Sequence, residues 1–490
     1  MNLQAVHVRV NDAATGKPTP VRLRITDAAG RYFAPFGHAA EFPVGPGEAV
    51  GGDVVVGGQR WAYIDGACEI ALPPEELTID VRKGAEYRPL QTTVHLPAGK
   101  LALRFAVERW TDPRASGWYS GDTRAHNLPP HAALLEAAAE GLTVVNLLAY
   151  QAPILASDGQ SHPTYPNLAA FSGQQPCLER DCHLVVVNTH NRHPVLGRLG
   201  LLDCHRPVFP LTFGGSDATD DWSLADWCRQ CHRKRGLVIW TDAFAGQVGH
   251  AGEALADAIL DDVDAIEIDP TGPTRFRAWY HLLNAGIRVP LVGASAKDSN
   301  RTPLGAMRTY ARLSDGHSFE WPAWVEAVKA GRTYVTSGPI VSFEVEGVGP
   351  GGVVRRRDRA APLRVAFGAS AVEPFDRVDV LADGNVVASG MGEGQHAEIP
   401  AAAWVAVRCI GGGHILAHTS PVYVECEGDP PQVDPASVEF VVSHLDRTRD
   451  WIESQGQFEK PKSRDHLVGI LNAARQQLLA RAGGSGTIGA

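Results

Sequence analysis

Three residues suited to acid–base, metal-binding or anion-binding chemistry alternate along one short stretch of the chain. Asp122, Arg124 and His126 all lie within the segment Gly117–Asn127. If this segment is extended, the three side chains project from one face, because side chains on a strand repeat every two residues. Imidazole and carboxylate suit zinc, iron or manganese, whereas arginine suits an oxyanion. The segment is therefore the first candidate for a functional site.

Further polar residues follow apolar runs that predict buried strands. For any single one of them, an ordinary hydrogen-bonded loop residue is the simpler interpretation. As a set at strand ends they indicate the mouth of a binding or catalytic site. The set comprises His190, His193, Arg198, Asp242, Glu267, Lys297 and Asp298.

Apolar runs and amphipathic segments alternate after residue 115 and predict repeated strand–helix units. About seven such alternations are typical of a closed or nearly closed α/β barrel, whose chemistry lies at the carboxyl ends of the strands. The expected helices are 131–140, 224–235, 254–260, 275–284 and 321–330. The expected strands are 142–148, 184–187, 199–202, 237–240, 265–268, 289–292 and 334–336.

Short alternating runs flank this region on both sides and predict two β-sandwich-like modules. Aromatic residues of the first module permit carbohydrate binding, although core packing is the simpler interpretation; they are Tyr32, Phe33, Phe36, Trp61 and Tyr63. Two amphipathic helices, 437–451 and 464–482, are expected to close the chain. The predicted domains are 1–112 (sandwich), 113–339 (α/β barrel), 340–430 (β module), 431–484 (helical tail) and 485–490 (flexible end).

Bulk composition excludes several classes of function. The formal net charge of −10 over 490 residues argues against a nucleic-acid partner. No 18-residue apolar run or signal core is visible, so we expect a cytoplasmic protein without a membrane span. Cys228 and Cys231 match a haem-attachment spacing, but attachment needs export, and Ser223 with Asp226 predicts a helix cap just before them. The eight cysteines are therefore expected to be reduced.

Several longer motifs resemble one family. They are Gly117–His126, Asn191–Arg198, Leu237–Trp240, Arg308–Arg312 and Ala327–Pro339. They are similar to the PHP (polymerase and histidinol phosphatase) superfamily, in its CehA/McbA-like metallohydrolase branch, over roughly residues 1–430. The resemblance implies a distorted (β/α)7-type barrel with two or three divalent ions that hydrolyses phosphoester, ester or amide bonds.

Five positions depart from the ligand pattern that the resemblance implies. Arg124 and Arg198 stand where the family has histidine, and His190 stands where it has glutamate. Asp242 replaces a ligand histidine, and Ala296 replaces a ligand aspartate. A guanidinium offers donors but no lone pair, and alanine ligates nothing. The multinuclear metal site that the family implies is therefore not intact in this sequence.

Two hypotheses follow. In the first, the chain is a metallohydrolase homologue with a degenerate metal site, a pseudoenzyme whose Arg124, Arg198 and Lys297 bind a small anion while His126 or His190 retains an acid–base role. Alternatively, Arg124 forms an ion pair with Asp122 or Asp242, and salt bridges fill the vacated metal site. In the second hypothesis, His126, His190, Asp242 and Glu267 hold one zinc, manganese or iron ion, and the chain is an active hydrolase. The substrate and the oligomeric state are not specified by the sequence.

Overall fold

The computed structural model describes residues 3–37, 42–45, 48–50, 53–155, 161–215, 218–245, 250–268, 273–314, 319–428 and 432–483. The predicted flexible end, 485–490, lies outside these residues. The chain divides into two compact units. The first unit is Met1–Ser172, Pro176–Val187 and Ala294–Arg308, and the second is Gly173–Gln175, Asn188–Gly293 and Thr309–Ala490.

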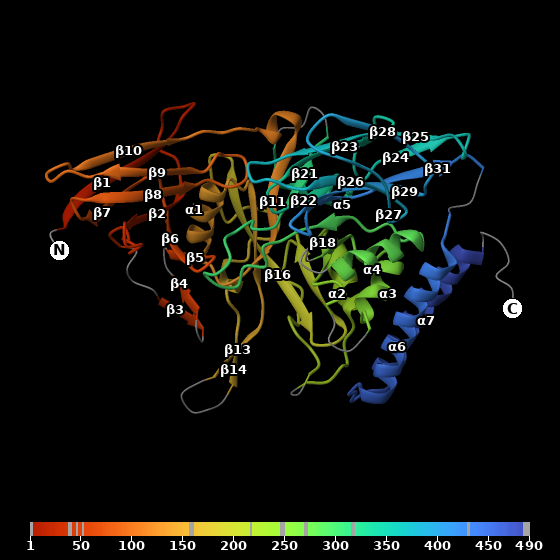
Figure 1. Ribbon diagram of the computed structural model, residues 1–490. Helices are drawn as coiled ribbons and strands as arrows, with labels where there is room; N and C mark the ends of the chain where they lie inside the picture. Colours follow the sequence, from red (N-terminus) through yellow and green to blue (C-terminus); the bar gives the residue numbers. More distant parts are fainter. Residues whose placement is uncertain are drawn as a thin grey trace. The chain divides into compact units, whose positions relative to one another are not determined.

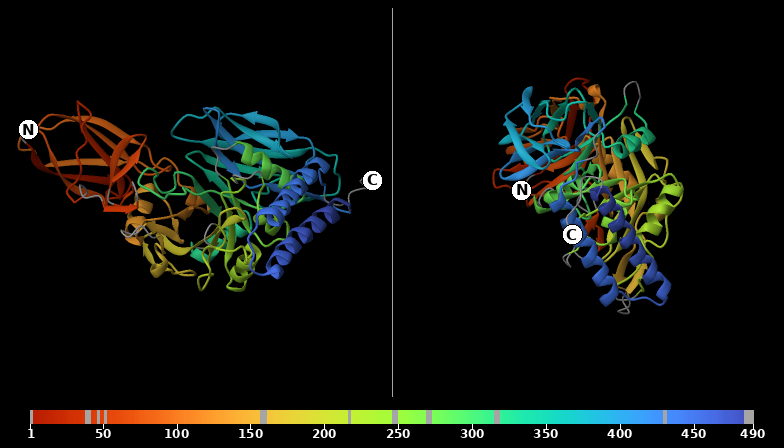
Figure 2. Two further views of the ribbon diagram at one scale, coloured as in Figure 1. Left: turned by 90° about the horizontal axis from the view of Figure 1, so that it is seen from below. Right: turned by 90° about the vertical axis from the view of Figure 1, so that its right-hand side faces the viewer.

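The first unit begins with two β-sheets that enclose an apolar core (Figures 1 and 2). The smaller sheet has the order β10 (Ala102–Val107), β1 (Gln4–Asp12), β7 (Ala67–Leu72). The larger has the order β5 (Asp53–Val56), β6 (Gln59–Ile64), β2 (Val21–Asp27), β8 (Glu76–Arg82), β9 (Leu90–His95). A short pair, β3 (Phe42–Gly45) and β4 (Glu48–Val50), is separate from both. Val6, Val8 and Val10 of β1 are buried in alternation, as expected for a strand with one face on the core.

Aromatic residues of this module contribute mainly to its interior. Trp61 and Tyr63 are buried and pack with Val54 and Ala139, and Phe33 belongs to the core between the sheets. Core packing, the simpler of the two interpretations, is therefore correct for these three aromatic side chains. Phe36 is 57% exposed and remains the one of the five that faces solvent most openly.

The first unit also contains the segment that carries the first candidate residues. Strand β11 (Trp118–Ala125) pairs in parallel with β12 (Val144–Ala149), and helix α1 (Pro130–Glu140) connects them. Helix α1 ends at Gly141, which adopts the left-handed conformation typical of a helix C-terminus. The same unit contains the hairpin β13 (Ala152–Leu155) and β14 (Ser161–Thr164), and β15 (Leu178–Arg180).

In the second unit the sheet order β17–β18–β19–β20 begins beside the part of β16 that follows Val187. Strand β17 (Gly197–Leu202) is antiparallel to both β16 (His183–His193) and β18 (Leu237–Thr241), whereas β19 (Ala265–Glu267) and β20 (Leu291–Val292) continue in parallel. Three residues between β16 and β17 are too few for a crossover helix, so a hairpin interrupts the expected strand–helix alternation. The architecture is mixed α/β with β-sandwich content, and the closed barrel remains a prediction.

Three helices follow the strands of this sheet, α2 (Leu224–Arg233), α3 (Glu253–Ile259) and α4 (Pro273–Asn284). The expected cap is present, because the Ser223 hydroxyl accepts a hydrogen bond from the Asp226 N–H at 3.0 Å. Cys228 and Cys231 are fully buried on α2, so their spacing reflects core packing of a helix. Strand β21 (Arg308–Arg312), helix α5 (Trp321–Lys329) and strand β22 (Thr333–Thr336) come next along the chain.

The second β module and the helical tail complete the second unit. One sheet has the order β23 (Ile340–Val345), β25 (Leu363–Ser370), β28 (Gln395–Ile399). The remaining strands are β24 (Val353–Arg356), β26 (Arg377–Ala382), β27 (Asn385–Gly390), β29 (Trp404–Gly411), β30 (His414–Thr419) and β31 (Val422–Cys426). Helices α6 (Pro435–Gln455) and α7 (Pro461–Gly483) lie side by side and contact α3 and α4 (Figures 1 and 2). None of the helices in the described ranges is long and apolar enough to cross a membrane.

Candidate functional site

The candidate residues of the first unit lie on β11 and directly after it. Asp122, Arg124 and His126 are all buried. The register with β12 shifts between Asp122 and Ala125, where β11 holds one more residue than its partner. An extra residue reverses the parity of side-chain direction along a strand. The unbroken alternation on which the shared face was predicted is therefore interrupted within β11, and the common direction of the three side chains remains a prediction.

Asp122 binds backbone amides of a distant loop. Its Oδ1 accepts the N–H groups of Ser295 (3.1 Å) and Arg124 (3.2 Å), and its Oδ2 accepts the N–H of Gly305 (2.9 Å). The carboxyl is completely buried, and this burial raises its pKa although the amide hydrogen bonds act in the opposite direction. Asp122 thereby attaches the segment 294–305 to β11, which is a structural role.

His126 is oriented by the main chain. Its Nδ1 lies 2.9 Å from the carbonyl oxygen of Leu148, which can only accept, so Nδ1 carries a proton. The Tyr150 ring meets the imidazole edge-on at a centroid distance of 4.9 Å, and the His126 N–H donates to the carbonyl of Lys297 at 2.6 Å. A histidine held in this tautomer by a carbonyl is suited to act as a base or a ligand through Nε2.

Lys297 is buried, with 1% of its side chain exposed. Its ammonium donates to the carbonyls of Ser299 (3.1 Å) and Thr302 (2.8 Å) and lies 3.5 Å from the Glu136 carboxylate. The two carbonyls accept hydrogen bonds from the ammonium, and the Glu136 carboxylate adds an ion pair. The predicted role of Lys297 in anion binding is untested, but its contacts are those of an interior structural cation.

Glu136 gives this buried pair a pH dependence. Burial is the main cause that raises the pKa of Glu136 from 4.5 to about 7, with Glu140 raising it further and Lys297 and Arg22 acting to lower it. Since the pKa is higher in the folded state, the stability that Glu136 contributes is fully present below pH 4.5 and is lost as the pH rises to about 7. We expect Glu136→Gln to abolish about 3 kcal/mol of this loss. Urea denaturation at a series of pH values between 4 and 8 measures it.

Glu326→Gln is the matched control, because it also changes a helix glutamate to glutamine. Its side chain lies on α5 and is exposed. The control is expected to retain the pH dependence of the unmodified chain. Equal slopes in Glu136→Gln and the unmodified chain would contradict the assignment of this pH dependence to Glu136.

His190 lies inside a strand and not after its end, which corrects the prediction that this strand ends at residue 187. It sits in β16, opposite Gly200 of β17, because the hairpin extends the strand to His193. The Arg192 Nε–H donates to His190 Nδ1 at 3.0 Å, so Nε2 carries the proton and donates to the Thr241 hydroxyl at 2.9 Å. In this tautomer neither ring nitrogen of His190 presents a lone pair to a metal ion.

Arg198 and Asp242 form an ion pair at 3.0 Å. Their backbones are adjacent because Arg198 on β17 is in register with Thr241, the last residue of β18. The guanidinium is 50% exposed, so the pair contributes at most about 1 kcal/mol and is easily exchanged. Glu267 ends β19 and is 5% exposed, and its carbonyl accepts the N–H of Ala243. An ion pair between Arg124 and Asp242 was one of the arrangements expected in a vacated metal site. Here Arg198 forms the ion pair with Asp242.

His193 has a structural role. Its Nδ1 accepts the N–H groups of Val195 (3.1 Å) and Leu196 (2.7 Å), so Nε2 carries the proton and donates to Asp220 at 2.8 Å. Burial lowers the pKa of His193, which keeps the ring neutral. Gly214 lies so close that an added Cβ would fall 2.1 Å from His193 Nε2. The ring therefore closes the hairpin against the loop that contains Asp220.

The metal site that the resemblance implies can be tested against these donors. Among the residues that the structure describes, no three His, Cys, Asp or Glu side chains are grouped so that they could hold a metal ion. His190 uses both ring nitrogens within the protein, and Asp242 faces a guanidinium. A metal needs three or four convergent lone pairs. As placed here, His190 and Asp242 therefore do not fit a metal centre, and no chemical step is assigned to one.

Sequence reasoning missed two features of the molecule. Glu136, the buried partner of Lys297, is 161 positions away along the chain and carries no local signal. Four arginines within Arg355–Arg359 did carry a signal, because they are a basic cluster in a chain of net charge −10. Two of the four, Arg356 and Arg359, line a cavity of the second unit.

Comparison with known proteins gives little guidance. No protein-family profile and no curated protein sequence matches the chain. Among solved structures, PsfC from Pseudomonas syringae PB-5123 aligns with 44% of this chain and 90% of its own length, at 14% identity and a TM-score of 0.29. The lesion-specific endonuclease PfuEndoQ from Pyrococcus furiosus aligns over 45% of this chain and 58% of its own length, at 13% identity and a TM-score of 0.28. At these TM-scores the likeness carries no argument about fold or activity.

Proposed function

We propose that this chain is a homologue of PHP-type metallohydrolases whose metal site is degenerate, and that it binds a small anion without metal-dependent hydrolysis. The tautomer of His190 carries the proposal. Its Nδ1 accepts a hydrogen bond from Arg192 and its Nε2 donates one to Thr241, so both ring nitrogens are hydrogen-bonded within the protein. Because protein groups take the place of a metal at this position, the hydrogen bonds of His190 support a fold that is stable without a metal ion.

The ion pair of Arg198 supports the anion-binding part of the proposal. A half-exposed guanidinium next to one carboxylate can exchange that carboxylate for an oxyanion of a ligand, and arginine binds such groups in a bidentate manner. Arg124 and Lys297, the other two predicted anion ligands, are both buried. Arg198 is therefore the residue at which anion binding is tested first.

A second candidate function, hydrolysis with one divalent ion, is favoured by one observation. His126 donates Nδ1–H to a main-chain carbonyl, which is the arrangement that orients metal-ligating and general-base histidines elsewhere. Under this alternative Nε2 of His126 would be a ligand or a base. The two functions differ in what His126 contributes to activity.

Elemental analysis of the full chain, purified without chelator, separates the two functions. We expect substoichiometric zinc, manganese and iron, and no hydrolysis of bis(p-nitrophenyl) phosphate or p-nitrophenyl acetate above background when any of these metals is added. His126→Gln and Asp242→Asn are expected to leave that background unchanged.

A stoichiometric metal that survives dialysis against a chelator would overturn the proposal. So would a metal-stimulated hydrolysis that both variants abolish, because the same residues would then be ligands. The matched control is His193→Gln, which changes a histidine that already has protein partners on both ring nitrogens.

A further inference from the structure

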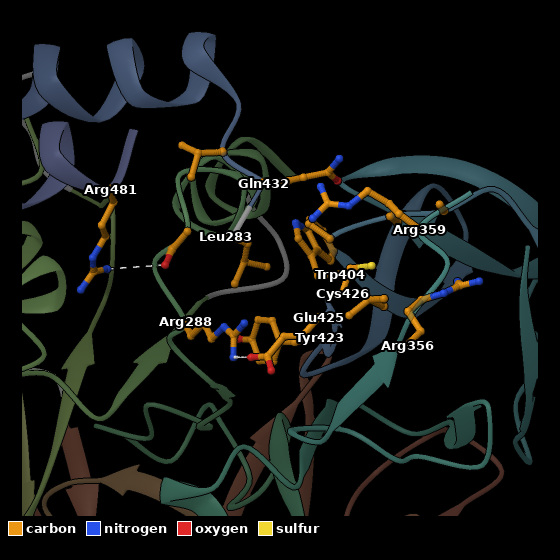
Figure 3. Close-up of a pocket in the computed structure, with 16 residues that line it drawn as sticks. Leu283, Arg288, Arg356, Arg359, Trp404, Tyr423, Glu425, Cys426, Gln432 and Arg481 are labelled. Carbon is orange, nitrogen blue, oxygen red and sulfur yellow. Dashed lines mark hydrogen bonds and ion pairs between the residues drawn. The ribbon is translucent and has the colours of Figure 1, made fainter. Parts of the chain in front are cut away.

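A cavity of about 540 Å³ lies in the second unit, and none of the candidate-site residues lines it (Figure 3). Its walls come from the end of α4 and the loop after it, from β24 and β31, from the segment before β29, and from the end of α7. Cavities of this size accommodate small organic molecules. All of its walls belong to one compact unit, so it does not depend on how the two units are placed.

The charged groups of the cavity are unbalanced. Four arginines line it, against the single carboxylate of Glu425; they are Arg288, Arg356, Arg359 and Arg481. Glu425 is paired with Arg288 at 2.9 Å, and Arg481 reaches Asp261, outside the cavity, at 3.2 Å. The formal charge of the lining is therefore positive in a chain whose net charge is −10. A positive concave surface attracts and retains anions.

The arginines differ in their positions. Arg359 extends toward Trp404 and Gln432 in Figure 3, whereas the guanidinium of Arg356 is turned away from these groups and donates to the Ala361 carbonyl at 2.6 Å. Arg288 lies across the ring of Tyr423, at 4.6 Å from the ring centroid. Arg359 and Arg288 are therefore the cations placed to contact a ligand, and Arg356 adds to the local potential.

The rest of the wall is neutral and largely apolar. Trp404 is held by a 2.7 Å hydrogen bond from its Nε1 to Asn284, and burial raises the pKa of the Tyr423 phenol, which stays protonated at neutral pH. Small and branched apolar residues complete the lining; they are Leu283, Ala401, Ala402, Ala403, Val424 and Val433. Such a wall favours an apolar or aromatic body beside the charged group of the ligand.

We propose that this cavity binds a small organic anion, in which a carboxylate or phosphate contacts Arg359 and Arg288 while an apolar or aromatic body lies against Tyr423 and Trp404. Bidentate pairing with guanidinium groups suits both kinds of oxyanion. The proposal is independent of the proposed function, because it uses none of the residues of the candidate site.

Calorimetric titration of the full chain at constant ionic strength tests the proposal. The probes are phenyl phosphate, benzoate, inorganic phosphate and benzyl alcohol. We expect one or both of the organic anions to bind more tightly than inorganic phosphate, and benzyl alcohol not to bind. Tighter binding of phenyl phosphate or of benzoate identifies which oxyanion the cavity prefers.

Arginine variants test whether the organic anion binds in this cavity. Arg359→Ala is expected to weaken it about tenfold to a hundredfold, and Arg359→Lys to weaken it less, because lysine keeps the charge and loses the bidentate geometry. Arg364→Ala is the matched control, since Arg364 is an exposed arginine of the same β module that pairs with Glu346. Arg198→Ala removes the guanidinium of the candidate site, so any binding that this variant abolishes is assigned to that site and not to the cavity.

Several results would overturn the proposal. One is the absence of binding by either organic anion at millimolar concentration. Another is an equal loss in Arg359→Ala and Arg364→Ala, which would indicate non-specific attraction. Equal affinity for inorganic phosphate and phenyl phosphate would contradict the apolar part of the site. Loss of binding in Arg198→Ala but not in Arg359→Ala would assign the anion to the candidate site, which supports the proposed function and rejects the cavity.

Discussion

Replacing Asp122 with alanine is expected to lower the free energy of unfolding by about 3–6 kcal/mol. The substitution removes the acceptor of three N–H groups, those of Ser295, Arg124 and Gly305, at a position that is completely buried. Each buried donor left without a partner costs about 1–3 kcal/mol. Chemical denaturation measures the total, and hydrogen–deuterium exchange at the amides of Ser295 and Gly305 measures the local effect.

Asp122→Asn is the informative companion variant. The asparagine side chain keeps one acceptor oxygen for Ser295 and Arg124, but its NH2 group would face the N–H of Gly305, so two donors would oppose each other. We expect an intermediate loss, with faster exchange at Gly305 than at Ser295. A loss below about 1 kcal/mol in the alanine variant would show that the segment 294–305 does not depend on this carboxylate.

Replacing Glu253 with alanine is expected to have the second large effect, about 3–5 kcal/mol. Glu253 is completely buried, and its two carboxylate oxygens accept the N–H groups of Leu224 (2.8 Å) and Ala225 (3.1 Å), the first two residues of α2. With the Ser223 hydroxyl on Asp226, it satisfies three of the four N–H groups that a helix N-terminus leaves without an internal partner. Thermal and urea denaturation measure the loss.

Glu253→Gln and Ser223→Ala separate the contributions to this helix start. Glutamine keeps one acceptor and the shape of the side chain, so its expected loss is smaller than that of alanine. Ser223→Ala removes only the cap and is expected to cost about 1 kcal/mol. If Glu253→Ala cost no more than Ser223→Ala, the buried carboxylate would not be the main support of α2.

Burial also raises the pKa of Glu253, and it raises the pKa of the neighbouring Asp257 together with the charge of Glu253. A carboxyl whose folded-state pKa is raised contributes stability that is lost as the pH rises through that pKa. The unmodified chain is therefore expected to be less stable at alkaline than at mildly acidic pH. Glu253→Gln is expected to reduce this difference.

The local order of the chain was determined by the sequence itself. Apolar periodicity predicted the helix that became α1 (Pro130–Glu140), and the pair Ser223 and Asp226 predicted the cap of α2. These signals involve residues within one or two turns of each other, so short-range sterics and hydrogen bonding decide them. The basic cluster Arg355–Arg359 is also a local feature of the sequence, but it was missed, and its use depends on the fold.

The tertiary structure alone decided what the candidate residues do. Strand β11 contains one more residue than its partner β12 in the stretch after Asp122. An antiparallel hairpin extends β16, so His190 lies inside a sheet and contacts Thr241. Lys297 forms an ion pair with Glu136, 161 positions away along the chain, and Arg288 forms one with Glu425, 137 positions away. Such partners depend on how distant segments of the chain pack together. The partner in turn decides which tautomer a histidine adopts and which ion pair a charged side chain forms. The residue types were thus present in the sequence, whereas their protonation and pairing came from the fold.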